Sequence, residues 1–290
     1  MPAAHLALIA LIDVLWAFNI VAFKYAVEAL PPIAVVFLRY TIVLAICLPW
    51  LRWLPGRMGI VLLTGFIGGA LYFSLTGLSV AAADNISALA IVGQLSVPFS
   101  VVLAVIFFKE RIRWPRILGI TLAFIGIVIL SFDPAIANER LGILLTVLAT
   151  LVYAVSSLLM RRLKGVHPLT IHAWLAVVSL PLLFVASLVF EPGALAGVGD
   201  LRLATFGWIA YSAIGASVVG HAGMSWLLQQ HPVSVIAPMT LPTPLISVAL
   251  GVMLMSTPIT PQMIAGGAVA LVGVAIVTLR TARAQVREAS

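Results

Sequence analysis

The amino-acid sequence predicts an all-α integral membrane protein with ten transmembrane helices, arranged as two inverted five-helix repeats with both termini in the cytoplasm. Three observations support this prediction. Of the 290 residues, 63% are hydrophobic and 9% are charged, whereas soluble domains carry roughly a quarter charged residues. Ten apolar segments are long enough to cross a bilayer, which needs about 20 helical residues. The stretch from Asn85 to Leu130 occurs twice without a gap, which indicates an internal duplication.

The composition also excludes several classes of protein. Mean hydropathy is +1.20, and the apolar segments lack the polar face that a soluble helix turns to water. The net charge of +7 comes from basic residues in short loops, a pattern typical of membrane topology signals and not of a nucleic-acid-binding face. The single cysteine, Cys47, cannot form an intrachain disulfide. We therefore expect lipid as the solvent, with no nucleic-acid partner, metal or cofactor.

Helix-breaking residues separate the apolar segments. Pro31 and Pro32 follow the first segment and Pro115 starts the fifth, as expected of proline at helix boundaries. The N-terminus lacks the basic region of a cleaved signal peptide, so the first segment is expected to remain as a helix. The predicted segments are about 6–27, 32–51, 58–78, 85–107, 114–131, 140–160, 169–190, 204–227, 233–255 and 261–279.

Lys and Arg are distributed unequally between the two sets of loops. Twelve lie on the side of the termini, whereas Lys24, Arg140 and Arg202 lie on the other side and Arg39 lies within the second segment. Cytoplasmic loops of membrane proteins are enriched in Lys and Arg. Both termini are therefore predicted to lie in the cytoplasm.

The repeat extends beyond Asn85 to Leu130, because Trp16 aligns with Tyr153 in the first and sixth segments. Five segments per copy is an odd number, so the second copy enters the membrane from the opposite side. Inverted repeats of this kind are typical of secondary transporters, which bind substrate near the midplane between the halves. The predicted units are 1–132, 138–280 and a cytoplasmic tail, 281–290. The gapless duplication of Asn85 to Leu130 pairs, among others, Ser87 with Ser234, Gly119 with Gly266, and Gly126 with Gly273.

Two groups of residues in the first copy resemble a known family. They are Leu15-Trp16-Ala17-Phe18-Asn19 with Lys24, Pro31-Pro32 and Leu38-Arg39, and Phe107-Phe108-Lys109-Glu110-Arg111 with Leu118-Gly119 and Gly126. They are similar to the EamA branch of the drug/metabolite transporter superfamily, over almost the whole chain. Bacterial aromatic amino-acid exporters are the most similar members, which implies export of such amino acids or similar metabolites across a bacterial inner membrane. The second copy departs from the pattern, with Thr257 and an alanine in place of Glu110 and Arg39.

Helical spacing places an aromatic residue beside a polar one on two predicted segments. Trp16 and Asn19 share a face of the first segment, and Tyr153 and Ser156 share a face of the sixth. Such a pair suits an amphipathic small molecule, because the ring can stack and the polar group can orient the molecule. The alternative is ordinary helix packing. We take these four residues as candidates for substrate binding.

Two charged residues lie inside apolar segments. Asp13 is a candidate proton acceptor or partner for an ammonium group, because intramembrane acids are costly; alternatively, water or a loop arginine near the cytoplasmic face could solvate it. Arg39 lies about two helical turns into the second segment. It could attract a carboxylate, or its long side chain could extend to the outer interface.

Gln94, His221 and Tyr72 are further candidates for the wall of a substrate cavity. Gln94 and His221 lie near the middle of the fourth and eighth segments, and His221 shares a helical face with Ser217. A lone intramembrane histidine also occurs as a packing residue. Tyr72 shares its face with small residues such as Gly65, which allow close helix approach, so a structural role is its main alternative.

Prolines interrupt two predicted helices, Pro98 in the fourth segment and Pro238, Pro242 and Pro244 in the ninth. Each removes the hydrogen bond to the carbonyl four residues earlier, and a free carbonyl in a membrane needs protein or a water-filled cavity beside it. We expect both segments to line the pathway and to bend, the ninth more than the fourth. Simple kinks absorbed by neighbouring Ser and Thr are the alternative.

Together these features predict a secondary transporter or facilitator with one midplane site and alternating access. The sequence has no HExxH motif, phosphate-binding loop or Ser-His-Asp cluster, so catalytic residues are not expected. Two other functions stay open at this point: proton-coupled export of cationic drugs with Asp13 as the counter-charge, and uncoupled conduction through a channel. The short connections leave a monomer plausible.

Overall fold

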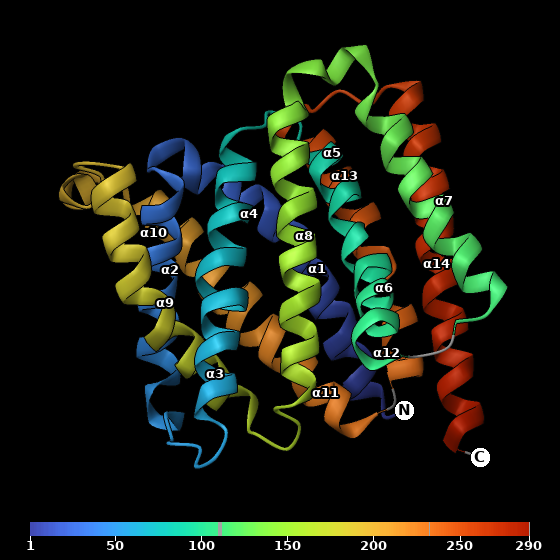
Figure 1. Ribbon diagram of the computed structural model, residues 1–290. Helices are drawn as coiled ribbons and strands as arrows, with labels where there is room; N and C mark the ends of the chain where they lie inside the picture. Colours follow the sequence, from blue (N-terminus) through green and yellow to red (C-terminus); the bar gives the residue numbers. More distant parts are fainter. Residues whose placement is uncertain (110–111, 232, 290) are drawn as a thin grey trace.

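The computed structural model describes residues 1–109, 112–231 and 233–289, and all regular structure in these ranges is helical. Glu110 and Arg111 of the family-like motif lie outside the described residues. Both termini lie at the same end of the helical bundle (Figure 1). The α-helices are α1 Ala3–Ala29, α2 Pro32–Cys47, α3 Met58–Thr64, α4 Tyr72–Ala81, α5 Ile86–Val92, α6 Ser96–Phe108, α7 Trp114–Ser131, α8 Arg140–Arg161, α9 Pro168–Phe190, α10 Leu203–Tyr211, α11 Gly223–Gln230, α12 Val233–Met239, α13 Pro242–Met255 and α14 Pro261–Ala289.

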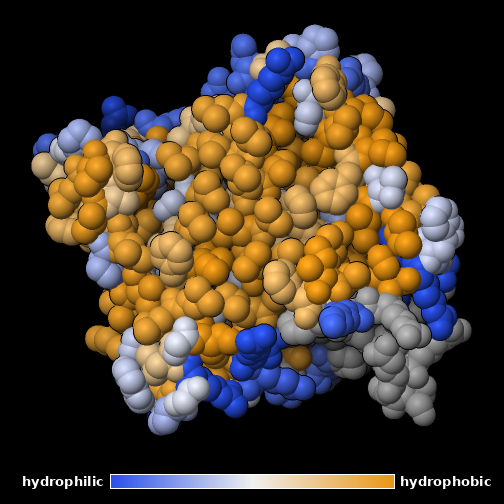
Figure 2. Space-filling model, in the orientation of Figure 1, coloured by the Kyte–Doolittle hydropathy of each residue, from blue (hydrophilic) through white to orange (hydrophobic). Residues whose placement is uncertain are grey.

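Nine helical spans in the described residues are long and apolar enough to cross a membrane, judged by length and composition. They match nine of the ten predicted segments. On the face shown in Figure 2, a broad apolar surface separates hydrophilic residues at the two ends of the molecule. Side chains as large as Phe190 are 74% exposed, and such exposure over a wide surface requires lipid as the surrounding medium.

The ninth predicted segment is not one continuous helix, which corrects the expectation for 233–255. α12 ends at Met239, and α13 begins at Pro242 after the intervening Thr240 and Leu241. Proline is well suited to the first position of a helix because its missing N–H would have no partner there. In the fourth predicted segment, α5 and α6 are joined through a tight 3-10 turn, Gly93–Leu95, shortly before Pro98.

Two spans contain π-helical segments at their centres. Gly65–Leu71 lies between α3 and α4, and Ser212–Ala222 lies between α10 and α11. The register of the duplication aligns Gly65 with Ser212, so both repeats have a π-helix at the same place. π-Helical segments widen the helix and are frequent at functional sites. A helical face drawn with a period of 3.6 residues does not hold through either segment.

Helix packing repeats in the two halves. α1 packs against α10, α13 and the second π-helical segment, whereas α8 packs against α4, α6 and the first. α2 with α9 and α7 with α14 form opposite edges of the bundle (Figure 1). The contacts of α1 with α13 and the second π-helical segment are equivalent to those of α8 with α6 and the first, with the repeats exchanged, as an inverted duplication predicts. The contacts of α1 with α10 and of α8 with α4 are not equivalent, because α10 precedes its π-helical segment whereas α4 follows the other one.

The α7–α14 seam depends on glycines from both repeats. A Cβ built on Gly119 would lie 2.8 Å from the carbonyl oxygen of Gly273, and one on Gly266 would lie 2.6 Å from that of Gly126. The duplication pairs Gly119 with Gly266 and Gly126 with Gly273, so these are one contact made twice. The seven-residue glycine interval in the sequence therefore allows the two helix backbones to touch.

Candidate functional site

A chain of aromatic rings crosses from one repeat to the other. The ring centroids of Trp16 and His221 are 5.0 Å apart, and those of His221 and Phe73 are 6.3 Å apart. The Phe73 and Tyr72 rings are 4.6 Å apart, and the Tyr72 and Tyr153 rings are 5.1 Å apart. These five residues form what we call the ring cluster. The structure thus brings together four predicted candidates, two from each half.

The two π-helical segments pack against α1 and α8, the helices that carry the two ends of the ring cluster, Trp16 and Tyr153. Trp16 Nε1 donates a hydrogen bond to the Ala216 carbonyl at 3.2 Å, and a side chain at Gly220 would overlap the Trp16 ring. In the other half, a side chain at Gly68 would overlap the hydroxyl of Ser156, which is buried. Gly220 in the second π-helical segment therefore makes room for Trp16 of α1, and Gly68 in the first makes room for Ser156 of α8.

Arg39 lies beside the ring cluster and does not extend to the outer interface. Its guanidinium carbon is 4.2 Å from the centroid of the Phe73 ring, a cation–π distance. Its Nε and Nη2 donate to the Ser217 hydroxyl at 3.0 and 2.7 Å. The residue is only 2% exposed. The snorkelling alternative is wrong for Arg39, because helices of both repeats enclose its side chain.

Two predicted polar residues on α1 differ in their partners. Asn19 Oδ1 is buried and accepts no hydrogen bond within the described residues. Asp13 is 5% exposed and accepts a hydrogen bond from Thr243 Oγ1 at 2.7 Å. Asp13 is therefore linked to the proline-rich start of α13, and no Lys or Arg of the described residues forms an ion pair with it.

Gln94 and Pro98 lie on the interrupted span of α5 and α6, and the other three prolines lie on the interrupted span of α12 and α13. Gln94 is half-buried in the 3-10 turn that packs against α8 and α14. Pro98 and Pro244 are buried, and Pro238 lies inside α12. α5 packs directly against α13. A role for Gln94 in binding and for the prolines in flexing stays a prediction.

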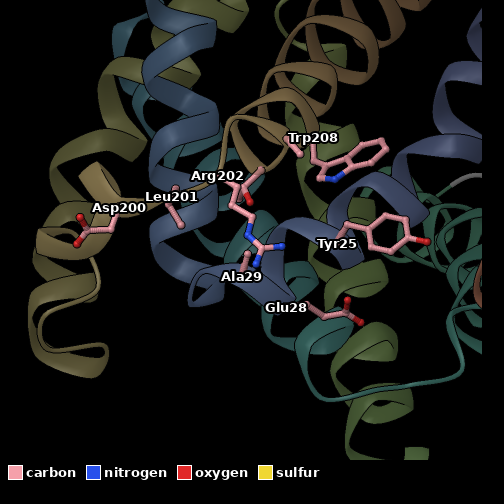
Figure 3. A pocket seen from close by; sticks show the side chains of 9 residues that line it. Tyr25, Glu28, Ala29, Asp200, Leu201, Arg202 and Trp208 are labelled. Atoms are coloured by element: carbon pink, nitrogen blue, oxygen red, sulfur yellow. The ribbon is translucent and has the colours of Figure 1, made fainter.

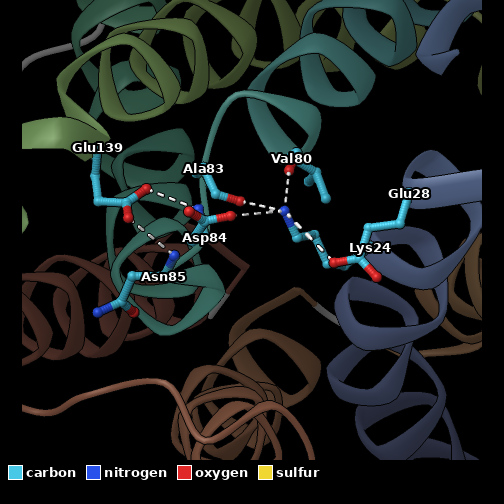
Figure 4. Close-up of polar contacts among 7 residues, drawn as sticks. All are labelled: Lys24, Glu28, Val80, Ala83, Asp84, Asn85 and Glu139. Atoms are coloured by element: carbon cyan, nitrogen blue, oxygen red, sulfur yellow. Dashed lines mark hydrogen bonds and ion pairs between the residues drawn. The ribbon is translucent and has the colours of Figure 1, made fainter.

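A polar network joins several helices (Figure 4) at the end of the bundle opposite the termini (Figure 1). Lys24 Nζ donates to the Ala83 carbonyl at 2.6 Å and lies 3.5 Å from Asp84 Oδ1. The Glu139 carboxylate accepts from the backbone N–H groups of Asp84 and Asn85 at 2.9 and 3.2 Å. The network therefore ties α1, the turn between α4 and α5, and the start of α8 together at this end.

Lys24→Met is expected to loosen this end of the bundle. Lys24 is 5% exposed and its ammonium group satisfies a carbonyl at the end of α4, so its loss leaves that carbonyl without a charged donor. We expect backbone hydrogen exchange over residues 83–88 to become about tenfold faster, corresponding to roughly 1.4 kcal/mol. Lys164→Met, at an exposed lysine, is the matched control. Unchanged exchange at 83–88 would show that Lys24 does not stabilise this end.

An open cleft of about 440 Å³ lies at the end of α1 and the start of α10 (Figure 3). The Tyr25 and Trp208 rings stack at 5.3 Å on its wall, and the Arg202 side chain extends into it from the preceding linker (Figure 3). Its lining contains no member of the ring cluster. We therefore treat the cleft as a surface feature and the ring cluster with Arg39 as the candidate site.

Two repeats of apolar helices around a buried polar and aromatic cluster are typical of a multi-pass membrane transporter. The chain belongs to the EamA-like transporter family, whose model matches residues 4–132 and again residues 140–279. The substrate of such a transporter is a small molecule, and its surroundings are a lipid bilayer.

Relatives and a solved structure resemble the chain over nearly its full length. An "Uncharacterized transporter" of Archaeoglobus fulgidus is 29% identical, over 93% of this chain and 96% of the relative. A "Probable amino-acid metabolite efflux pump" of Escherichia coli and another of Salmonella typhimurium are each 22% identical, over 92% of both chains. A crystal structure with a TM-score of 0.66 covers 98% of this chain and all of its own at 18% identity, which supports the fold alone.

Proposed function

We propose that this chain is a secondary transporter or facilitator that exports small metabolites, aromatic amino acids foremost, from the cytoplasm of a bacterium across its inner membrane. The observation that carries the proposal is the ring cluster, which joins three rings of the first repeat to two rings of the second. Movement of one half against the other would change the ring contacts and open the cluster to either side, as alternating access requires.

The chemistry of the cluster supports an amphipathic substrate with a ring. Aromatic side chains provide stacking surfaces, and the unpartnered Asn19 Oδ1, about one helical turn after Trp16 on α1, provides an acceptor. The efflux direction and the amino-acid class are further supported by the names of the two bacterial relatives. The polar network of Lys24 and Glu139 lies away from the termini, and we assign it to the outer side on the distribution of basic residues.

Export of cationic drugs is a weaker candidate. Asp13, its proposed counter-charge, is engaged by Thr243. The ring cluster itself lies beside the positive charge of Arg39, which would repel a cation in a medium of low dielectric constant. Asp13 fits a different role in the proposal, as a link between α1 and the broken span α12–α13 that we expect to flex at Pro238, Pro242 and Pro244.

Flux measurements in proteoliposomes test the proposal. We expect labelled phenylalanine, tyrosine or tryptophan to cross the membrane faster with the protein than in empty vesicles, and faster than a cationic dye does. An imposed pH gradient that accelerates the flux would assign proton coupling; flux that follows only the substrate gradient would assign facilitation. Transport of the dye in preference to all three amino acids would overturn the proposed substrate.

A further inference from the structure

We infer that Arg39 binds a carboxylate group of the transported molecule, and this inference rests on the proposed function because it places the substrate at the ring cluster. The site combines the guanidinium of α2, the rings of both repeats and the buried amide of Asn19. The substrates it selects are small carboxylates that also carry an aromatic group.

The charge of Arg39 lacks a neutralising partner in the protein. No carboxylate of the described residues lies within 4.0 Å of its guanidinium, and the ion pairs found belong to Lys24. The side chain is enclosed by helices. The ring centroids of Phe23 and Phe73 lie 6.0 and 4.2 Å from the guanidinium carbon. An uncompensated charge in a protein interior costs several kcal/mol, and charged residues inside membranes mark substrate pathways. An incoming anion would remove that cost.

The hydrogen bonds of the guanidinium leave room for such an anion. Arginine has five N–H donors, yet Nε and Nη2 both converge on the single hydroxyl of Ser217. Nη1 makes no hydrogen bond with any residue in the described ranges. A carboxylate offers two oxygens at the spacing of the guanidinium fork and is the preferred bidentate partner of arginine. Lysine would supply the charge without this fork.

The neighbouring groups extend the match beyond the carboxylate. Phe73 lies between Arg39 and the other rings of the cluster, so an aromatic group attached near the carboxylate would reach them. Asn19 lies one helical turn before Phe23 on α1, and its free Oδ1 is an acceptor for an ammonium group. An aromatic α-amino acid therefore offers a partner to each kind of group at the site.

Binding of matched ligands to the purified protein tests the role of Arg39. Isothermal calorimetry in detergent would compare phenylalanine with phenylalaninamide, which keeps the ring and the amine but has no carboxylate. We expect the wild type to prefer phenylalanine by about tenfold or more, because hydrogen bonds to charged groups are stronger than those between neutral groups. Arg39→Gln is expected to reduce the preference to within about twofold of unity, with amide binding nearly unchanged. Arg39→Lys should give an intermediate preference, because lysine keeps the charge but not the fork of donors.

Each other outcome has a definite meaning. Loss of both ligands in Arg39→Gln at an unchanged melting temperature, or a wild-type preference near unity, would overturn the inference. If Arg39→Gln does not fold, the wild-type preference and its reduction in Arg39→Lys decide. If aromatic amino acids are transported but are not preferred over their amides, the proposed function stands and the carboxylate-binding role of Arg39 fails. If no amino acid binds, but phenylacetate binds better than phenylacetamide and Arg39→Gln abolishes the difference, the amino-acid proposal fails and the carboxylate site stands.

Discussion

Gly126→Ala is expected to destabilise the protein by about 3 kcal/mol, whereas Gly59→Ala is expected to be neutral or slightly stabilising. Glycine to alanine within a helix normally gains up to about 1 kcal/mol. At Gly126 the new methyl group would overlap the backbone of α14 at Gly266 and Ala270. A helix backbone cannot rotate away as a side chain can, so the two helices must separate and their packing is lost. A Cβ on Gly59 meets nothing within 4 Å.

SDS-induced unfolding in mixed micelles would measure both changes. Gly273→Ala is a second test, because the duplication pairs Gly273 with Gly126 and a Cβ there would overlap α7 in the same way. We expect similar losses for the two variants. If Gly126→Ala behaved as Gly59→Ala does, α7 and α14 would not be in backbone contact, and the two-fold arrangement of the repeats would be wrong at this seam.

Trp16→Ala is expected to lower the flux of aromatic amino acids by about tenfold or more without changing the amount of protein in the membrane. The change removes the ring that contacts His221 and the donor to Ala216, and it leaves a void next to Gly220. A tenfold effect corresponds to about 1.4 kcal/mol, within the range of one aromatic contact.

Two further variants give this result its meaning. Trp16→Phe keeps a ring but loses the N–H donor, so we expect a smaller loss of flux. Trp114→Ala removes a tryptophan that is 71% exposed at the start of α7, and its flux should equal that of the wild type. Wild-type flux in Trp16→Ala would exclude Trp16 from the site.

Most of the fold could be predicted from the sequence because its determinants are local or repeated. Apolar length and helix-boundary prolines such as Pro32 define the spans, and the glycine interval at Gly119 and Gly126 identifies the seam. The π-helical segments could not be predicted, because their wider turns depend on packing against the other repeat. The division of 233–255 into α12 and α13 was expected only as a bend, since helix and break differ by a few hydrogen bonds around Pro242.

The candidate site was predicted in part. Trp16 and Tyr153 could be found because they align in the duplication, and the structure places both in the ring cluster. Phe73 was missed, although it follows Tyr72 directly and lies at the centre of the cluster. The burial of Arg39 depends on Ser217 of the opposite repeat, and one helix considered alone gives no signal for such a contact.

The central claim is that both repeats build one substrate site, and a double-mutant cycle on binding tests it most directly. Dissociation constants for phenylalanine would be measured for the wild type, Trp16→Ala, Tyr153→Ala and the double variant. If both rings contact one bound molecule, directly or through the cluster, their effects on binding are coupled by at least about 0.5 kcal/mol. Binding losses that add within about 0.3 kcal/mol, or a Tyr153→Ala variant that binds as the wild type does, would contradict a single site shared by the two halves.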